Sequence, residues 1–171
     1  MSIEIIPTSV QFADSLHACL SAVAQEKKYI ALLEAPAIYY LRSYINENRS
    51  LENPLFIAIK NQEVIAWCDI IRDPMPVYSH TGILGMGILK PYRRQGLGKL
   101  LLKTSIQSAF DKGIERIELN VFASNIGAIS LYQSFGFKQE GRQIKKHFLE
   151  GHYQDLIQMA LFKADINAFS D

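Results

Sequence analysis

The segment between Thr81 and Lys112 restricts the fold more than any other part of the chain, because three kinds of local structure follow one another there. Residues 81–89 form an apolar run with the composition of a strand, although three of them are glycine. A basic, glycine-rich turn over residues 93–99 leads into an amphipathic helix over residues 96–112, which Gly113 ends. A strand, a turn and a helix in this order predict a helix packed against a sheet, and therefore an α/β domain.

The segments on either side have the same mixed character. Two apolar runs joined through Asn61-Gln62 predict an antiparallel hairpin. The segments that we expect to be strands are residues 3–6, 55–60, 64–70, 81–89, 117–122, 137–145 and 153–161. The segments that we expect to be helices are residues 10–26, a stretch that begins near Ile38 and ends by Asn48, residues 96–112 and residues 125–135.

Length and charge limit the partners of the chain. Its 171 residues suit one domain, residues 1–171, and a net charge of +1 provides no general field for nucleic acid or anionic lipid. The amino terminus lacks the pattern of a secretory signal and no apolar run reaches membrane-spanning length, so we expect a cytoplasmic protein without a membrane partner. Cys19 and Cys68 are far apart and show no metal-ligand spacing, so we expect reduced thiols and no metal.

The glycine-rich turn has the chemistry of an anion site. A helix amino terminus presents unpaired backbone N–H groups, and glycine at positions 96 and 98 lets the backbone approach a bulky phosphate. Arg93, Arg94 and Lys99 can add charge-assisted contacts, which favours a diphosphate as the ligand. A Walker loop is excluded because Ile88 stands where its lysine must be, and no G-x-G-x-x-G fingerprint is present. A solvated loop before a helix is the alternative.

Two stretches of sequence together resemble a known family. Arg93, Gly96 and Gly98 match the R/Q-x-x-G-x-G/A motif with which the GNAT superfamily of N-acetyltransferases binds acetyl-coenzyme A (acetyl-CoA). Residues 125–137, Asn-Ile-Gly-Ala-Ile-Ser-Leu-Tyr-Gln-Ser-Phe-Gly-Phe, resemble a second signature of that family, N-x-x-A-x-x-L-Y-x-x-x-G-F, at every marked position. The resemblance covers an acetyl-CoA-binding core at about residues 55–162. Pro91 lies one position later than the proline often seen in this loop.

The resemblance implies a fold, a reaction and a cofactor. The fold would be an α/β (α+β) single domain with a mixed, mostly antiparallel sheet of about seven strands flanked by about four helices. The reaction would be direct transfer of an acetyl group from acetyl-CoA to a primary amine of a small molecule or peptide, without a metal; a homodimer is left open. By the same resemblance, the cofactor would contact Met86, Gly87, Ile88, Arg93, Arg94, Gln95, Gly96, Leu97, Gly98, Lys99 and Asn125.

The resemblance also assigns roles within the site. In this family the glycine-bearing strand is bulged and splays from its neighbour, and a backbone N–H near Ile88 would polarise the thioester; alternatively, Gly82 and Gly85 only relieve crowding. Tyr132 would protonate the departing thiolate, or else packs as a core aromatic. Asn125 would contact the cofactor, cap its helix, or do both.

The sequence does not assign a general base or an acceptor. Residues 81–89 contain no carboxylate, which leaves His80, Asp69, Glu34 or an ordered water as candidates. By resemblance, the acceptor would bind near residues 29–40 and 146–153, whose charges are mixed. The acceptor could be a small amine, an amino acid, a peptide or a protein amino terminus. Two other functions are also open: a protein or ribosomal N-acetyltransferase, and an acetyl-CoA sensor without turnover.

Overall fold

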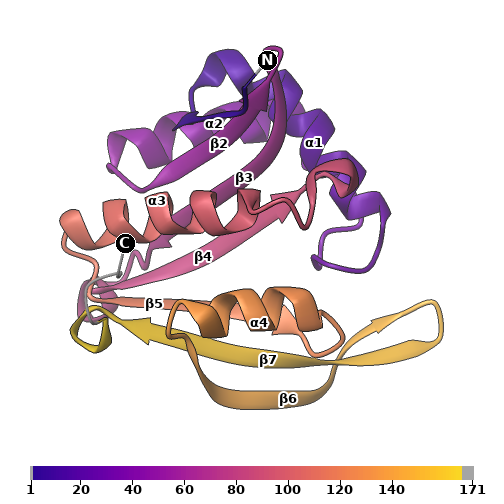
Figure 1. Ribbon diagram of the computed structural model, residues 1–171, viewed down its shortest axis with the longest axis vertical. Coiled ribbons are helices and arrows are strands. Elements are labelled where there is room, and N and C mark those ends of the chain that lie inside the picture. Colours follow the sequence, from indigo (N-terminus) through magenta and orange to yellow (C-terminus); the bar gives the residue numbers. More distant parts are fainter. Residues whose placement is uncertain (1, 167–171) are drawn as a thin grey trace.

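A computed structural model describes residues 2–166 of the chain. Within these residues, seven strands form one sheet in the order β1-β2-β3-β4-β5-β7-β6, and four α-helices pack on it (Figure 1). The strands are β1 (Glu4–Pro7), β2 (Leu55–Lys60), β3 (Glu63–Arg72), β4 (Thr81–Ile88), β5 (Arg116–Phe122), β6 (Lys138–Leu149) and β7 (His152–Phe162). The helices are α1 (Ala13–Gln25), α2 (Ile38–Ser50), α3 (Leu97–Asp111) and α4 (Ile126–Ser134). The predicted α/β fold class is confirmed.

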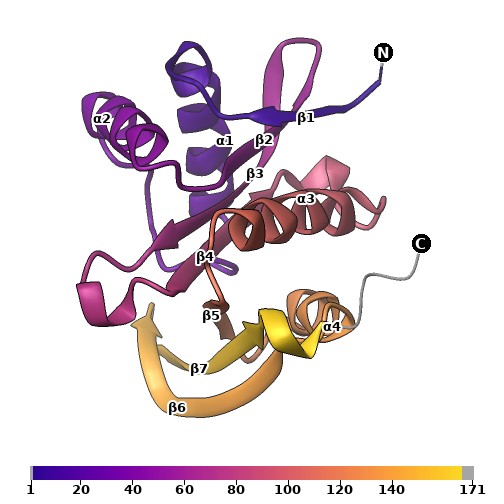
Figure 2. The same ribbon diagram turned by 90° about the vertical axis from the view of Figure 1, so that its left-hand side faces the viewer.

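The sheet has helices on both faces. Seen along the sheet, α1 and α2 lie on one side and α3 and α4 on the other (Figure 2). Neighbouring strands are antiparallel with one exception among the described residues, the parallel pair β4 and β5. The predicted hairpin through Asn61 and Gln62 is β2 and β3, and both turn residues have positive φ.

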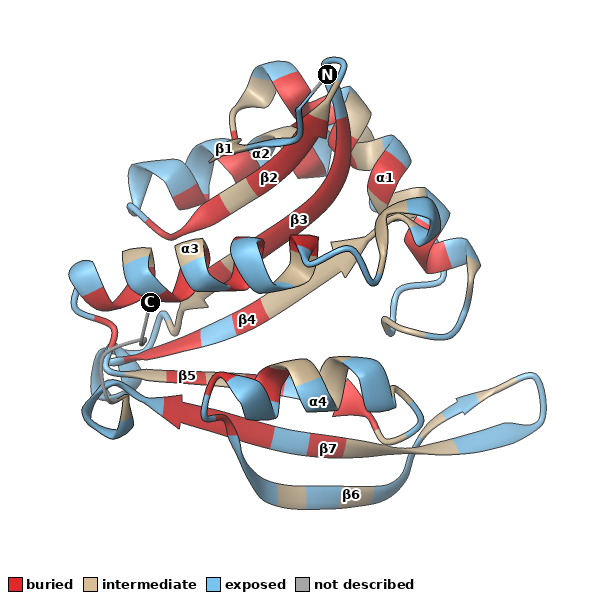
Figure 3. Cartoon of the chain, viewed as in Figure 1, coloured by how far each residue is buried: buried red, intermediate tan, exposed pale blue. Residues whose placement is uncertain are grey.

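Each face of the sheet has its own hydrophobic core. The larger core lies under α3 and α4, where Leu101, Leu102 and Ile106 are fully buried. The smaller core lies under α1 and α2 and includes Ile45 and Trp67. Full burial of one such side chain stabilises the fold by about 1.5–3 kcal/mol, so α3 is firmly attached to the sheet. Figure 3 shows that β6, at the sheet edge, is mostly exposed.

Strand β4 diverges from β5 but follows β3 along its whole length. It pairs with β5 only through residues 81–83, whereas it pairs with β3 in unbroken register from Gly82 to Ile88. The splayed strand that the family resemblance implied is therefore present. The prediction of a bulge in that strand is wrong for its pairing with β3, because no register shift interrupts that pairing.

The three glycines of β4 make room for side chains of neighbouring elements. A Cβ at Gly82 would lie 2.6 Å from the Ile70 side chain, and a Cβ at Gly87 would lie 2.1 Å from the ring of Trp67. A Cβ at Gly85 would lie 2.7 Å from the Asp69 carboxylate. The glycines thus relieve crowding, which was the alternative interpretation, and the unpaired edge toward β5 arises without a bulge.

The first helix begins later than the sequence predicted. Residues Val10–Phe12 form a 3-10 turn, and α1 starts at Ala13. Ser9, before the turn, makes no side-chain cap, and a tighter turn of this kind is common at the start of a helix. No helix among residues 2–166 is both long and apolar enough to cross a membrane.

Candidate active site

The loop between β4 and α3 exposes a row of backbone N–H groups. Gly96 precedes the helix with a left-handed φ of +81°, and no side chain caps the helix. The first backbone bonds of the turn run from the N–H groups of Lys99 and Leu100 to the Gly96 carbonyl. Among residues 2–166, the N–H groups of residues 94–98 have no backbone or side-chain acceptor. Together with the helix dipole, unpaired amides of this kind favour an anion, and the binding of a phosphate here stays a prediction.

Two of the predicted basic side chains lie in solvent beside these amides. Arg94 and Lys99 are exposed, and neither side chain forms an ion pair or hydrogen bond with another part of residues 2–166. Gln95 is exposed too, but its side-chain amide donates to the Pro91 carbonyl at 2.7 Å and so holds the loop in shape. Arg94 and Lys99 are therefore placed to contact a phosphate.

The Arg93 side chain is held by the protein itself. Its guanidinium pairs with both carboxylate oxygens of Glu26, at the end of α1, and one of these bonds is 2.8 Å long. It also donates to the Ile88 carbonyl at 2.7 Å and lies 4.5 Å above the ring centre of Tyr29. The Arg93 guanidinium lowers the pKa of Glu26, chiefly through the side-chain hydrogen bond. Sequence reasoning missed Glu26, because nothing in the helix pattern pairs it with residue 93.

Close packing explains the second glycine of the motif. A Cβ at Gly98 would lie 3.1 Å from the Ile88 side chain and 3.3 Å from that of Leu131, with Met86 at 3.8 Å. Met86 and Ile88 project toward the core under α3 and α4. The first turn of α3, the end of β4 and helix α4 therefore meet at Gly98, next to the place where β4 leaves β5.

Tyr132 lies on α4, and Asn125 is the residue that caps the start of that helix. The Tyr132 ring is buried and packs against Phe137, with ring centres 5.7 Å apart, and burial followed by the nearby Cys68 raises its pKa. Asn125 caps α4, because its side-chain oxygen accepts from the Ala128 N–H at 3.3 Å. The capping role is confirmed. Its contact with a cofactor stays a prediction, as does the acid role of Tyr132.

Of the candidate bases, Asp69 has the most unusual surroundings. It lies on β3, is half-buried, and accepts a hydrogen bond of 2.6 Å from the hydroxyl of Tyr44 on α2. Burial raises the pKa of Asp69 to about 6, although the hydrogen bonds from Tyr44 and from the backbone amides of Asp69 and Gly85 lower it. A carboxyl group with a pKa of about 6 is mostly ionised at neutral pH and can still accept a proton, as a general base requires.

The other two candidates are placed differently. His80 is exposed and precedes β4, so eight residues of extended chain, about 26 Å, separate it from Ile88. Glu34 is exposed in the connection between α1 and α2. Tyr44 was not among the predicted residues. The one available signal was Asp69 itself, a carboxylate within the apolar part of β3.

The end of α1 touches both sides of the predicted acceptor region. Glu26 binds Arg93 of the phosphate loop, and the next residue, Lys27, forms an ion pair with Glu150 at the turn between β6 and β7. The end of α1 is therefore joined both to the phosphate loop and to the turn between β6 and β7, and the binding of an acceptor near residues 29–40 and 146–153 stays a prediction. Exposed aromatic side chains occur in both segments, including Tyr39, Tyr40, Phe148 and Tyr153.

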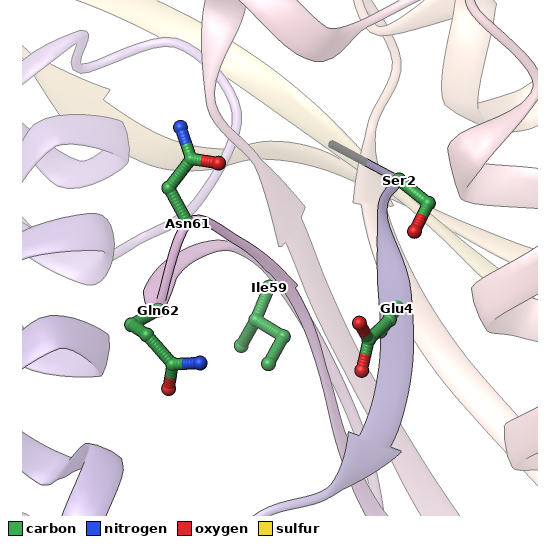
Figure 4. Close-up of a pocket in the computed structure, with 5 residues that line it drawn as sticks. All are labelled: Ser2, Glu4, Ile59, Asn61 and Gln62. Carbon is green, nitrogen blue, oxygen red and sulfur yellow. The ribbon is translucent and has the colours of Figure 1, made fainter.

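A surface pocket lies away from the glycine-rich loop. A shallow pocket of about 180 Å³ is lined by Ser2, Glu4, Ile59, Asn61 and Gln62 (Figure 4). It lies at the β1 edge of the sheet, on the far side of β2 and β3 from β4. Residues 2–166 contain no group of three His, Cys, Asp or Glu side chains that could hold a metal ion.

The fold and the two motifs define the class of this protein. The sequence profile of the Acetyltransferase (GNAT) family matches residues 15–137, so the chain belongs to that family. The solved acetyltransferase of GNAT family from Streptococcus pneumoniae is 28% identical and superposes with a TM-score of 0.88, covering 94% of this chain and 99% of that one. The structure of yncA from Salmonella typhimurium with its cofactor acetyl-CoA has the same fold, with a TM-score of 0.89 at 16% identity and 98% coverage of both chains.

Two bacterial relatives show how far the sequence similarity extends. The uncharacterized N-acetyltransferase YdgE of Bacillus subtilis is 32% identical over 104 residues, which make up 60% of this chain. The match spans about two thirds of that relative, 66% of its length. The L-amino acid N-acetyltransferase AaaT of Escherichia coli is 26% identical over 144 residues, which cover 82% of this chain and 87% of the relative.

Proposed function

We propose that the chain is an N-acetyltransferase that transfers an acetyl group directly from acetyl-CoA to a primary amine of a small molecule or peptide. The observation that carries the proposal is the row of unpaired amides at residues 94–98, next to the point where β4 leaves β5. Family membership and the acetyl-CoA bound to yncA support it. The residues present suit a diphosphate, because the space beside Gly96 is open: even a Cβ added there would meet nothing within 4 Å.

In this proposal the backbone binds the diphosphate and the side chains surround it. The amides of residues 94–98 hold the phosphate oxygens, while Arg94 and Lys99 add charge from the solvent side. Arg93 acts differently from the prediction, because its guanidinium is already bonded to Glu26. Its side chain positions the loop, and its backbone faces the cofactor. Met86, Gly87 and Ile88 offer the free edge of β4 to the pantetheine arm.

The chemical step requires a hydrogen-bond donor to the developing oxyanion and an acid for the thiolate. The N–H of Ile88 is placed on the diverging part of β4 and is the donor in this proposal. Tyr132 is the acid in this proposal: its raised pKa keeps the phenol protonated, so that a proton is present to neutralise the departing thiolate.

The acceptor would bind between the α1–α2 connection and the turn of β6 and β7. Exposed tyrosine and phenylalanine side chains in both segments favour an acceptor with an apolar portion, such as an amino acid or a peptide amino terminus. AaaT acts on L-amino acids by its name, and the bS18-alanine N-acetyltransferase of Escherichia coli, 33% identical over 85 residues, acts on a ribosomal protein. A test must therefore include both classes.

The test is acetyl transfer by the purified protein. The protein is mixed with acetyl-CoA and, in separate reactions, with L-amino acids, short peptides with a free amino terminus, and polyamines, and the release of the coenzyme A thiol is measured. Turnover with an amino acid or amine supports the proposal. Turnover confined to peptides favours a protein N-terminal acetyltransferase. Cofactor binding without turnover in any reaction would make the chain an acetyl-CoA sensor and contradict the proposal.

A further inference from the structure

We infer that Asp69, held by Tyr44, is the general base that takes a proton from the acceptor ammonium group. The inference rests on the proposed function and adds to it the residue that neither sequence motif contains. Asp69 and Tyr44 come from β3 and α2, outside the acetyl-CoA-binding motifs, and they meet through a hydrogen bond of 2.6 Å.

The position of Asp69 is fixed by strand pairing. Asp69 pairs with Gly85 on β4, and its Oδ1 lies so close over that residue that a Cβ there would be 2.7 Å away. β4 leaves β5 after Ile83, so Gly85 belongs to the diverging part of the strand. The carboxylate therefore lies over β4, one residue before Met86, where the cofactor arm is proposed to run.

The carboxylate and the cofactor are on opposite faces of β4. Gly85 and Gly87 face Asp69 and Trp67, and Trp67 belongs to the core under α1 and α2. Met86 and Ile88 alternate with them and pack toward α3 and α4. An amine that arrives from the α1–α2 side meets Asp69 first and the thioester behind it, which is the order that deprotonation and attack require.

The surroundings of Asp69 give its carboxylate hydrogen bonds but no positive charge. The Tyr44 hydroxyl occupies Oδ2, and Oδ1 faces Gly85. Leu55 of β2, which also pairs with Asp69, is apolar, and no residue between Thr81 and Ile88 can titrate. Within residues 2–166, no Lys, Arg or His forms an ion pair with this carboxylate. A cationic amine would be the first counter-charge that Asp69 meets.

A purely structural carboxylate would be a poor choice at this position. The side chain is half-buried, and burial raises its pKa to about 6, so the ionised form is disfavoured there. An asparagine would accept the same bond from Tyr44 without that penalty. A costly ionisable group beside a strand that opens for a ligand is the pattern of a functional residue.

The step balances in atoms and protons. The ammonium nitrogen loses two protons in all: one passes to the Asp69 carboxylate and from there to solvent. The nitrogen lone pair then forms a bond to the thioester carbonyl carbon, and the carbon–sulfur bond breaks with its electron pair on sulfur. The second nitrogen proton ends on that sulfur, directly or through Tyr132, to give the amide and the free thiol.

The experiment compares Asp69→Asn with the wild type, using acetyl-CoA and the best acceptor from the panel of amino acids and peptides. General-base catalysis contributes about 10²–10⁴-fold, so kcat/KM should fall at least a hundredfold while acetyl-CoA binding stays unchanged. An aminooxy analogue of the same acceptor is uncharged at neutral pH and should react nearly as fast with Asp69→Asn as with the wild type. Asp73→Asn, a substitution of a partly exposed carboxylate bonded to the Met75 amide, is the matched control and should change nothing.

Two further variants keep the inference falsifiable if Asp69→Asn does not fold. Tyr44→Phe removes a bond that lowers the pKa of Asp69, so the acidic limb of the kcat/KM profile should move to higher pH. Gly85→Ala should displace the carboxylate and lower kcat with the cofactor still bound. If the wild type turns over but none of these variants alters rate or pH profile, Asp69 is not the base and the proposed function stands. If the wild type transfers no acetyl group, the proposed function itself fails and the inference fails with it.

Discussion

The two faces of β4 carry their functional groups in different ways. On the α3 and α4 side, the proposed cofactor loop is continuous in sequence, and its proposed anion site consists of backbone amides at residues 94–98. On the α1 and α2 side, Asp69, Tyr44 and Glu26 come from three separate elements and depend on side-chain contacts. A backbone site tolerates changes of many side chains but not of its glycines, whereas a site built by side chains fails at single positions. The predictions below test that difference.

The largest effect is expected at the first glycine of the loop. Gly96→Glu places a side chain and a negative charge in the anion site, at a left-handed φ of +81° that glycine favours. We expect acetyl-CoA to stop binding, so the stabilisation of about 2.7 kcal/mol that a ligand gives at 100 times its dissociation constant should disappear. The measurement is the melting temperature with and without acetyl-CoA.

Gly113→Glu is the matched control for that substitution. Gly113 follows the same helix at its other end, also has a φ of +81°, and a Cβ added there would meet nothing within 4 Å. It should cost similar stability without the cofactor but keep the shift when the cofactor is added. An equal loss of the shift in both variants would argue against an anion site at the amino end of α3.

Tyr132→Phe tests the acid role on the cofactor face. The phenyl ring keeps its packing against Phe137, so binding and stability should change little, while turnover should fall by about a hundredfold, the usual cost of one catalytic proton donor. Steady-state rates with acetyl-CoA and the best acceptor measure the effect. Tyr78→Phe, at an exposed residue before β4, is the control. Equal rates for wild type and Tyr132→Phe would leave Tyr132 with a packing role only.

Glu26→Gln tests the contact that joins the two faces. Without the carboxylate, Arg93 loses its paired bonds, and both the phosphate loop and the α1–α2 connection lose a restraint. We expect the dissociation constant for acetyl-CoA and the KM for the acceptor to rise together, each by several-fold, because partly exposed ion pairs contribute about 1 kcal/mol or less. Isothermal titration and steady-state kinetics measure the two effects.

Glu140→Gln provides the comparison for Glu26→Gln. Glu140 also forms a paired contact with an arginine, Arg116, but at the far end of the sheet. It should alter neither constant. If Glu140→Gln changed both constants as much as Glu26→Gln does, the effect would reflect general stability, and the link between the faces would be refuted.

The smallest effect is a change in stability with pH. The pKa of Asp69 is raised to about 6 in the fold, so the folded state binds more protons than the unfolded state between about pH 4 and pH 6. The carboxyl group therefore lowers stability as pH rises through its folded pKa. Asp69→Asn should raise the melting temperature by a few degrees at pH 8 and by less at pH 4. A lower melting temperature at pH 8 would show that the ionised carboxylate stabilises the fold.

Much of the cofactor side could be predicted from the sequence because its determinants are local. Gly96 is needed for a left-handed turn, Gly113 for the helix end, and Asn125 for the cap of α4, and each acts within a few residues of its own position. The role of Arg93 was predicted less well. Its charge suggested a phosphate contact, but Glu26 lies 67 residues away and takes up the guanidinium in the folded chain.

The glycines of β4 also have neighbours that the sequence could not predict. Their presence in a strand indicated a special backbone, yet each one accommodates a side chain of another element: Ile70, Asp69 or Trp67. Which neighbour lies over which glycine depends on strand register. That register is set by the packing of both cores and cannot be obtained from the composition of one strand.

The amino-acid order alone determined the strand–turn–helix unit, its glycine-rich turn and the family to which the chain belongs, because hydrogen bonds and backbone conformations over a few residues specify these features. Only the tertiary structure decided that Asp69 lies over Gly85 with Tyr44 against it, and that Glu26 holds Arg93. The physical reason is distance along the chain: side chains far apart in sequence acquire a common dielectric, a shifted pKa and a defined geometry only when the sheet and helices pack together.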